Sequence, residues 1–82
     1  MNVTLLYFAA VRDLVGKDEE QVALPAGIGT IESLADHLTT LHPALEGRLG
    51  YVRFARNEEF AQPSDALANG DVIALIPPVA GG

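Results

Sequence analysis

The stretch LANGDVIALIPPVAGG, which runs from Leu67 to Gly82, carries the pattern that decides the fold. Its LANGD part predicts a turn, because Asn-Gly tolerates positive φ. The apolar run VIALI, residues 72–76, predicts the last strand. Two prolines, at positions 77 and 78, end that strand because proline cannot act as a donor in a central strand. A tail of residues 77–82 is therefore expected to leave the strand in extended form.

The chain begins with a strand and a short helix. NVTLLYF, residues 2–8, is rich in strand formers, and its apolar side chains fall on both faces. AAVRDLVG, residues 9–16, predicts a short helix closed by Gly16. A second strand is expected from Gln21 to Leu24, after a charged turn.

The longest helix is predicted to follow a loop rich in proline and glycine. Thr30 is a suitable N-cap, and Pro43 stops the helix. An apolar stripe at helical spacing is expected to face the sheet, and it consists of Ile31, Leu34, Leu38 and Leu41. YVRFARN, residues 51–57, predicts a third strand, and Phe60 lies in a short fourth segment.

This order of elements indicates a single α+β domain, residues 1–82, with a mixed sheet of four or five strands, one main helix and one short helix. The β-grasp, or ubiquitin-like, arrangement has this order, with the first and last strands side by side in the centre of the sheet. By pattern alone it is one of several arrangements that fit.

Both the first and the last strand are apolar on two faces, whereas a sheet covered by one helix buries only one face. The second face is expected to form an exposed apolar patch, and such patches usually mark an interface. We place Phe8, Phe60 and Ile76 in this partner interface. The alternative is that the short helix or the long loop covers this face.

Composition limits the partners and the compartment. Eleven acidic residues against five basic ones give a net charge of −6. This charge argues against nucleic acid and anionic membranes and favours a partner with a basic patch, unless it serves only solubility. The absence of cysteine, of a secretory leader and of a long apolar run is typical of a cytoplasmic protein.

Side-chain machinery for catalysis or metal binding is not evident. VGKD lacks the remaining residues of a phosphate loop, and AGIGTIE has Glu32 in place of a third glycine. His37 and His42 are five positions apart and form no ligand pair on one helix face, so we expect exposed or helix-end histidines and no metal site. The carboxylates of KDEE and NEE are expected to be solvated turn charges. No bound cofactor is expected.

The tail therefore becomes the candidate reactive group. An α-carboxylate is ionised at neutral pH and is a poor electrophile, but coupling it to AMP makes it an acyl donor. Gly81 and Gly82 have no Cβ, so their backbone can enter a narrow channel. Pro77 and Pro78 hold the preceding chain extended, and residues 77–82 reach about 20 Å.

LANGDVIALIPPVAGG resembles the ending of the small subunit of molybdopterin synthase, the MoaD family, and LLYFAAVRDLVG resembles that family's opening. ARNEE lies where members have a short turn motif centred on an asparagine. The resemblance spans essentially the whole chain. Arg56 departs from it, because a small apolar residue is more usual before that asparagine.

The resemblance implies a β-grasp sulfur carrier, a co-substrate and non-catalytic subunit whose partner supplies the catalytic side chains. Gly82 would be adenylated by an E1-like (MoeB-like) enzyme that uses ATP, and a sulfur donor protein would then convert it to a thiocarboxylate. The tail, which comprises Pro77, Pro78, Val79, Ala80, Gly81 and Gly82, would insert into the large (MoaE-like) subunit of a heterotetramer. There the sulfur would pass to a pterin precursor. The family interface falls at Phe8, Phe60 and Ile76 as well.

Two other functions fit the same tail. One is a related sulfur carrier for thiamine synthesis or tRNA thiolation, which differs only in the receiver of the sulfur. The other is a ubiquitin-like modifier, whose tail ends as an isopeptide on a lysine. The IPPVAGG ending favours the molybdopterin synthase subunit.

Overall fold

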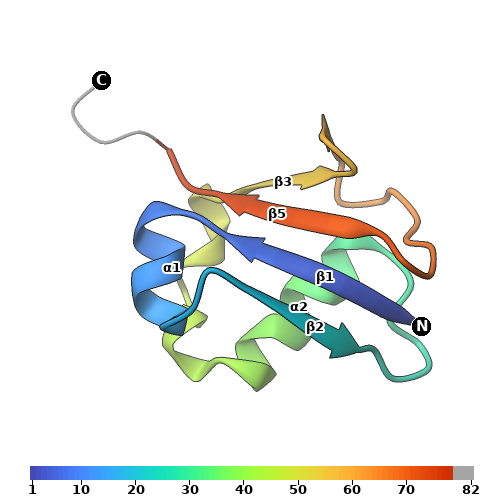
Figure 1. Ribbon diagram of the computed structural model, residues 1–82, viewed down its shortest axis with the longest axis horizontal. Helices are drawn as coiled ribbons and strands as arrows, with labels where there is room; N and C mark the ends of the chain where they lie inside the picture. The colour runs from blue at the N-terminus through green and yellow to red at the C-terminus, as the bar shows by residue number, and fades with distance from the viewer. Residues whose placement is uncertain (79–82) are drawn as a thin grey trace.

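Five strands form one mixed sheet in the computed structural model, which describes residues 1–78 (Figure 1). The strands are β1 (Asn2–Tyr7), β2 (Glu19–Ala23), β3 (Arg53–Arg56), β4 (Glu59–Phe60) and β5 (Val72–Ile76). The helices are α1 (Ala9–Val15) and α2 (Ile31–Leu41), followed by the short 3₁₀ helices η1 (Pro43–Leu45) and η2 (Leu49–Tyr51).

The first and last strands lie side by side in the centre of the sheet, as the β-grasp arrangement requires. The strand order is β2-β1-β5-β3-β4. β1 runs parallel to β5, with Leu5 opposite Ile73, and the other neighbouring pairs are antiparallel. The predicted α+β class and sheet size are therefore confirmed.

Capping residues set the end of α1 and the start of α2. Gly16 closes α1 in the left-handed region at φ 87°, a conformation that glycine adopts without steric cost. Thr30 caps α2: its hydroxyl accepts a hydrogen bond from the Ser33 amide, and the Ser33 hydroxyl accepts one from the Thr30 amide. This reciprocal capping box satisfies two amides that the helix leaves without intrahelical partners.

The predicted apolar stripe of α2 is confirmed at three of its four positions. Ile31, Leu34 and Leu38 are buried against the sheet, but Leu41 is 40% exposed, so its assignment to the core was wrong. Leu41 is the last residue of α2, and Leu45 from η1 is fully buried and completes the core instead.

Two strand boundaries also differ from the sequence prediction. β2 begins at Glu19, two residues earlier than expected, because Glu19 pairs with Leu6 of β1. β3 is shorter than residues 51–57, because Tyr51 lies in η2 and Asn57 lies in the turn before β4.

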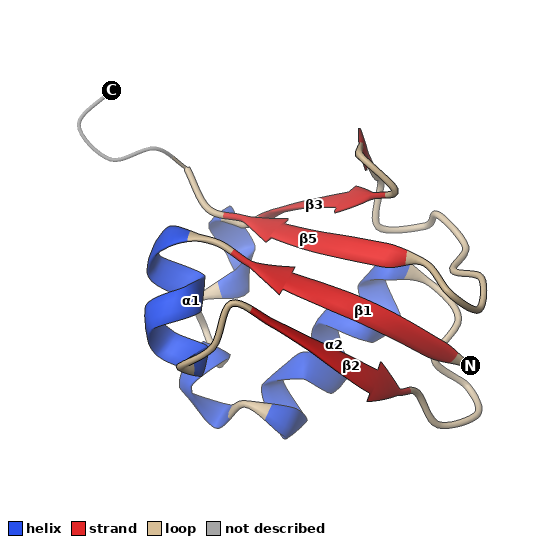
Figure 2. Ribbon diagram, in the orientation of Figure 1, coloured by secondary structure: helices blue, strands red, loops and turns tan. Residues whose placement is uncertain are grey.

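The hydrophobic core lies between one face of the sheet and the helices. In Figure 2, α2 passes behind the strands and α1 packs at one end of the sheet. The strand side chains that point toward the helices are buried, and they comprise Val3, Leu5, Tyr7, Phe54, Ile73 and Leu75. The opposite face of the sheet carries the alternate residues, and neither helix covers it.

Candidate functional site

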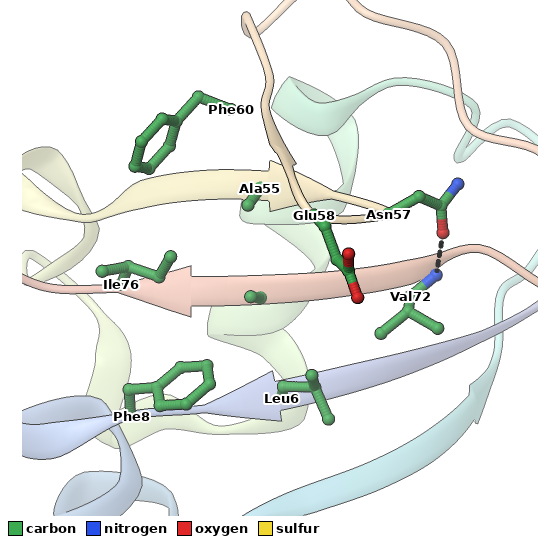
Figure 3. Close-up of a pocket in the computed structure, with 9 residues that line it drawn as sticks. Leu6, Phe8, Ala55, Asn57, Glu58, Phe60, Val72 and Ile76 are labelled. Carbon is green, nitrogen blue, oxygen red and sulfur yellow. Dashed lines mark hydrogen bonds between the residues drawn. The ribbon is translucent and has the colours of Figure 1, made fainter.

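The uncovered face of the sheet holds a shallow apolar groove, which we call the open-face groove. Strand alternation directs side chains from β1, β3 and β5 into it, and β4 adds one edge. Its volume is about 470 Å³, and it is lined by Leu6, Phe8, Ala55, Asn57, Glu58, Phe60, Val72, Ala74 and Ile76 (Figure 3).

The three residues that the sequence assigned to a partner interface lie around this one groove. Phe8 is 46% exposed at the end of β1, and Phe60 is 58% exposed on β4. Ile76, the last residue of β5, lies where the strand joins the tail. Large exposed apolar side chains gathered in this way favour protein binding. Their role in binding a partner stays a prediction.

Phe60 is held by an interaction that sequence reasoning missed. The guanidinium carbon of Arg53 lies 3.8 Å from the centre of the Phe60 ring, which is a cation–π contact. Arg53 and Phe60 lie on neighbouring strands, with Ala55 opposite Phe60. The contact orients an aromatic side chain at the rim of the groove.

The turn between β3 and β4 is a second feature of the site. Residues 57 and 58 connect the paired residues Arg56 and Glu59, so the loop has two residues. Asn57 has φ 51° and Glu58 has φ 74°, both in the left-handed region, as in a type I′ hairpin turn. The turn directs the Glu58 side chain from the hairpin toward β5 (Figure 3).

A hydrogen-bond network anchors this turn to the start of β5. Asp71 is buried, and its carboxylate accepts hydrogen bonds from Arg56 Nε at 2.8 Å, Asn57 Nδ2 at 2.9 Å and the Ala68 amide at 2.7 Å. The Asn57 side-chain oxygen in turn accepts one from the Val72 amide at 2.9 Å. Arg56 thus pairs with Asp71.

The same contacts determine the charge state of Asp71. Burial acts to raise the pKa of Asp71, but the Ala68 amide, the Asn57 side chain and the Arg56 guanidinium outweigh burial, so the pKa lies below its ordinary value. The carboxylate is therefore ionised at neutral pH and holds the hairpin against β5.

A second polar cluster, centred on Glu20, lies away from the groove. It shows that one of the sequence predictions was wrong. Glu20 was expected to be a solvated turn charge, but it is half-buried and accepts a hydrogen bond from the Tyr7 hydroxyl at 2.6 Å. It also pairs with His42, the C-cap residue of α2, and with Lys17. Burial opposes ionisation, but hydrogen bonds from Tyr7, His42 and Lys17 keep the pKa of Glu20 below its usual value.

The base of the tail lies between two grooves. Ile76 lines the open-face groove, whereas Pro77 and Pro78 line a second groove of about 580 Å³ next to α1 and the 3₁₀ helices. Tyr51, which is 79% exposed, is part of this second groove. The remaining predicted tail residues, Val79, Ala80, Gly81 and Gly82, lie outside the described residues.

The part of the chain that the structure describes contains no group of three or more His, Cys, Asp or Glu side chains able to hold a metal ion. Over the same residues, no helix has the length and apolar character needed to cross a membrane.

Comparison with known proteins finds one matching family model and full-length relatives. The model of the ThiS family matches residues 5–82. The molybdopterin synthase sulfur carrier subunit of Chlamydomonas reinhardtii is 39% identical, with all of both chains covered. The protein of the same description from Escherichia coli is 37% identical, with 98% of this chain and 99% of the relative covered.

A third relative carries a different description. Small archaeal modifier protein 1 of Haloferax volcanii is 35% identical, with 92% of this chain and 94% of the relative covered. The crystal structure of SAMP1 from the same organism superposes with a TM-score of 0.87 at 32% identity and covers all of both chains.

Proposed function

The chain belongs to the ThiS family, and from this membership we propose that it is the sulfur carrier subunit of a molybdopterin synthase. In this role Gly82 carries sulfur as a thiocarboxylate and delivers it to a pterin precursor during molybdenum cofactor synthesis. The observation that supports the proposal most directly is the full-length similarity to proteins described as molybdopterin synthase sulfur carrier subunits.

The proposed chemistry takes place on the carboxylate of Gly82. An activating enzyme of the E1 type joins this carboxylate to AMP from ATP, with release of pyrophosphate. Sulfide (HS⁻) supplied by a donor protein then attacks the acyl carbon; the new C–S bond forms as the C–O bond to AMP breaks, AMP and a proton leave, and the thiocarboxylate remains. The glycines at positions 81 and 82 suit this role because a backbone without Cβ atoms can enter a narrow active site. In this proposal the carrier binds no cofactor of its own, its activating enzyme consumes ATP, and the reaction takes place in the cytoplasm.

The proposed receiver is the large subunit of the synthase, which binds over the open-face groove. Ile76 belongs to this groove, and Pro77 and Pro78 follow it directly, so a partner that covers the groove also contacts the base of the tail. Proline has no N–H to donate to a neighbouring strand, so β5 ends at Ile76, before the two prolines. Catalytic side chains for sulfur transfer belong to this partner.

The test is to incubate the protein with its activating enzyme, ATP and a sulfur donor, and to measure the intact mass. We expect the mass increase that corresponds to replacing one carboxylate oxygen by sulfur. Deleting Gly82, or adding one residue after it, should abolish the increase because the reactive carbon moves by about 3.5 Å. Gly81→Ala should reduce the rate less than either change. Equal sulfuration of the extended protein, without trimming, would contradict the proposal.

Protein modification is the second candidate, and the similarity to small archaeal modifier protein 1 favours it. A modifier forms a ladder of covalent conjugates with cellular proteins, whereas a carrier gives a free thiocarboxylate. Immunoblotting of cells that express a tagged protein distinguishes the two. Conjugate ladders that require Gly82, without molybdopterin formation, would replace the carrier proposal.

A further inference from the structure

Glu58 places a carboxylate over an apolar groove without a partner of its own. The ion pairs formed among residues 1–78 involve the acidic residues Asp18, Glu20 and Asp71, and Glu58 takes part in none of them. Both cations of this hairpin are engaged elsewhere, because Arg53 stacks on the Phe60 ring and Arg56 pairs with Asp71. Figure 3 shows the Glu58 side chain directed toward β5, where the surrounding side chains are mostly apolar.

The backbone at Glu58 is also unfavourable for glutamate. Its φ of 74° lies in the left-handed region, at the position of a type I′ turn where glycine is the usual residue. Glycine would relieve this strain without loss of a hydrogen bond or ion pair within residues 1–78, because the Glu58 carboxylate forms neither there. Strained residues of this kind concentrate at functional sites, where another interaction compensates for the strain.

We propose that Glu58 is a recognition residue, and that the protein that covers the open-face groove places a lysine or arginine side chain against its carboxylate. This inference rests on the proposed function, since it needs a partner on that face. A carboxylate buried by a partner without a cation would lose its hydration and gain nothing in return, so an apolar partner surface alone would not fit. The partner surface is therefore apolar with a basic side chain opposite the hairpin turn.

The charge of the whole chain supports a basic partner rather than a second copy. Two copies that met through this groove would bring two molecules of net charge −6 together, with one Glu58 carboxylate from each copy at the contact. Like charges brought together at an interface are destabilising. A partner with a basic patch is instead attracted over a distance and oriented before contact.

The test measures binding to the large synthase subunit of the same organism by calorimetry, at low and at moderate salt. Glu58→Gln should raise the dissociation constant about tenfold or more, because the partner's cation then loses its counter-charge. Glu58→Lys should raise it further. The matched control is Glu59→Gln, which removes the same charge from the next residue. Glu59 lies on β4 opposite Arg56 and does not line the groove, so its substitution should leave the dissociation constant within about twofold.

Salt supplies an independent measurement. Because salt screens charge pairs, it should weaken the native complex more than the Glu58→Gln complex. Unchanged binding of Glu58→Gln, or equal losses for Glu58→Gln and Glu59→Gln, would overturn this inference and leave the proposed function standing. Absence of binding by the native protein would overturn both. Self-association of the native protein through this face, with no loss on Glu58→Lys, would show that the occupant is a second copy and would overturn the inference as well.

Discussion

At the scale of single residues, the β3–β4 turn combines one anchored side chain with one strained side chain. Asn57 is tied to Asp71 and Val72 by hydrogen bonds, and asparagine tolerates the left-handed region. Glu58 adopts the same region without such bonds. The hydrogen bonds of Asn57 therefore hold the turn in place, and the turn does not depend on the side chain of Glu58.

Replacing Glu58 by glycine should stabilise the isolated protein. Relief of the left-handed strain should add about 1 kcal/mol to the free energy of unfolding, which corresponds to a rise of about 4–8 °C in Tm for a domain of this size. Thermal unfolding followed by circular dichroism measures the shift. Glu59→Gly is the control, because its φ is not positive, and it should lower Tm. A lower Tm for Glu58→Gly would show that the turn is not strained.

Asp71 should make the stability of the protein depend on pH. Its folded pKa is lowered, so the unfolded state binds more protons as the pH falls, and unfolding becomes easier. The contribution is complete above the unfolded pKa of about 3.9 and is lost as the pH falls through the lowered folded pKa. Asp71→Asn should be less stable than the native protein at neutral pH, and the difference should shrink in acid.

Urea denaturation of both proteins, from neutral pH to about pH 3, measures this effect. Glu20 also has a lowered pKa and contributes to the acid sensitivity of both proteins equally. A difference between the two proteins that stays constant with pH would show that ionisation of Asp71 does not stabilise the fold.

At the scale of elements, α2 illustrates how one helix face becomes the core and where that face stops. Its buried residues belong to the same hydrophobic core as side chains of β1 and β5, whereas its last residue, Leu41, is 40% exposed. η1 follows immediately and supplies Leu45 to fill the remaining space. The helix and the 3₁₀ helix together, rather than the helix alone, cover the buried face of the sheet.

Leu38→Ala should therefore destabilise the protein far more than Leu41→Ala. Leu38 is fully buried, so its truncation should lower the free energy of unfolding by about 2–5 kcal/mol. Leu41 is partly exposed, and its truncation should lower it by about 1 kcal/mol. Urea denaturation of the two variants provides the comparison. Equal losses would mean that Leu41 contributes to the core as the sequence pattern predicts.

At the scale of the whole molecule, one face of the sheet is buried in the core, and the other, which we propose as the partner-binding face, is left uncovered by the helices. The buried face packs on the helices (Figure 2), and the opposite face holds the open-face groove, which ends at Ile76 beside the base of the tail (Figure 3). This division allows substitutions in the groove to change binding without unfolding the domain.

Phe60→Asp should weaken binding to the large synthase subunit at least about tenfold and leave Tm nearly unchanged, because Phe60 is exposed and outside the core. Calorimetry with the native partner gives the dissociation constant. The comparison is Tyr51→Asp, which alters an exposed aromatic residue in the second groove. If Tyr51→Asp weakens the complex and Phe60→Asp does not, the second groove is the docking surface.

Much of the architecture could be predicted from the sequence because it depends on local rules. Short apolar runs rich in strand formers predicted both central strands, glycine and proline marked the ends of α1 and β5, and Thr30 marked the start of α2. Because these runs are apolar on both sides, they also predicted an apolar second face. These patterns act over a few residues, so no knowledge of distant contacts was needed.

The tertiary structure decided what lies together across the sheet. Asp71, Arg56 and Asn57 form one network although up to fifteen positions separate them, and Glu20 meets His42 across twenty-two. Sequence patterns do not encode such contacts, because they depend on strand register and on how the helices pack. The ending with two glycines was visible in the sequence alone, whereas the groove beside its base, with Glu58 at the rim, exists only because β1, β5 and the β3–β4 hairpin are brought side by side.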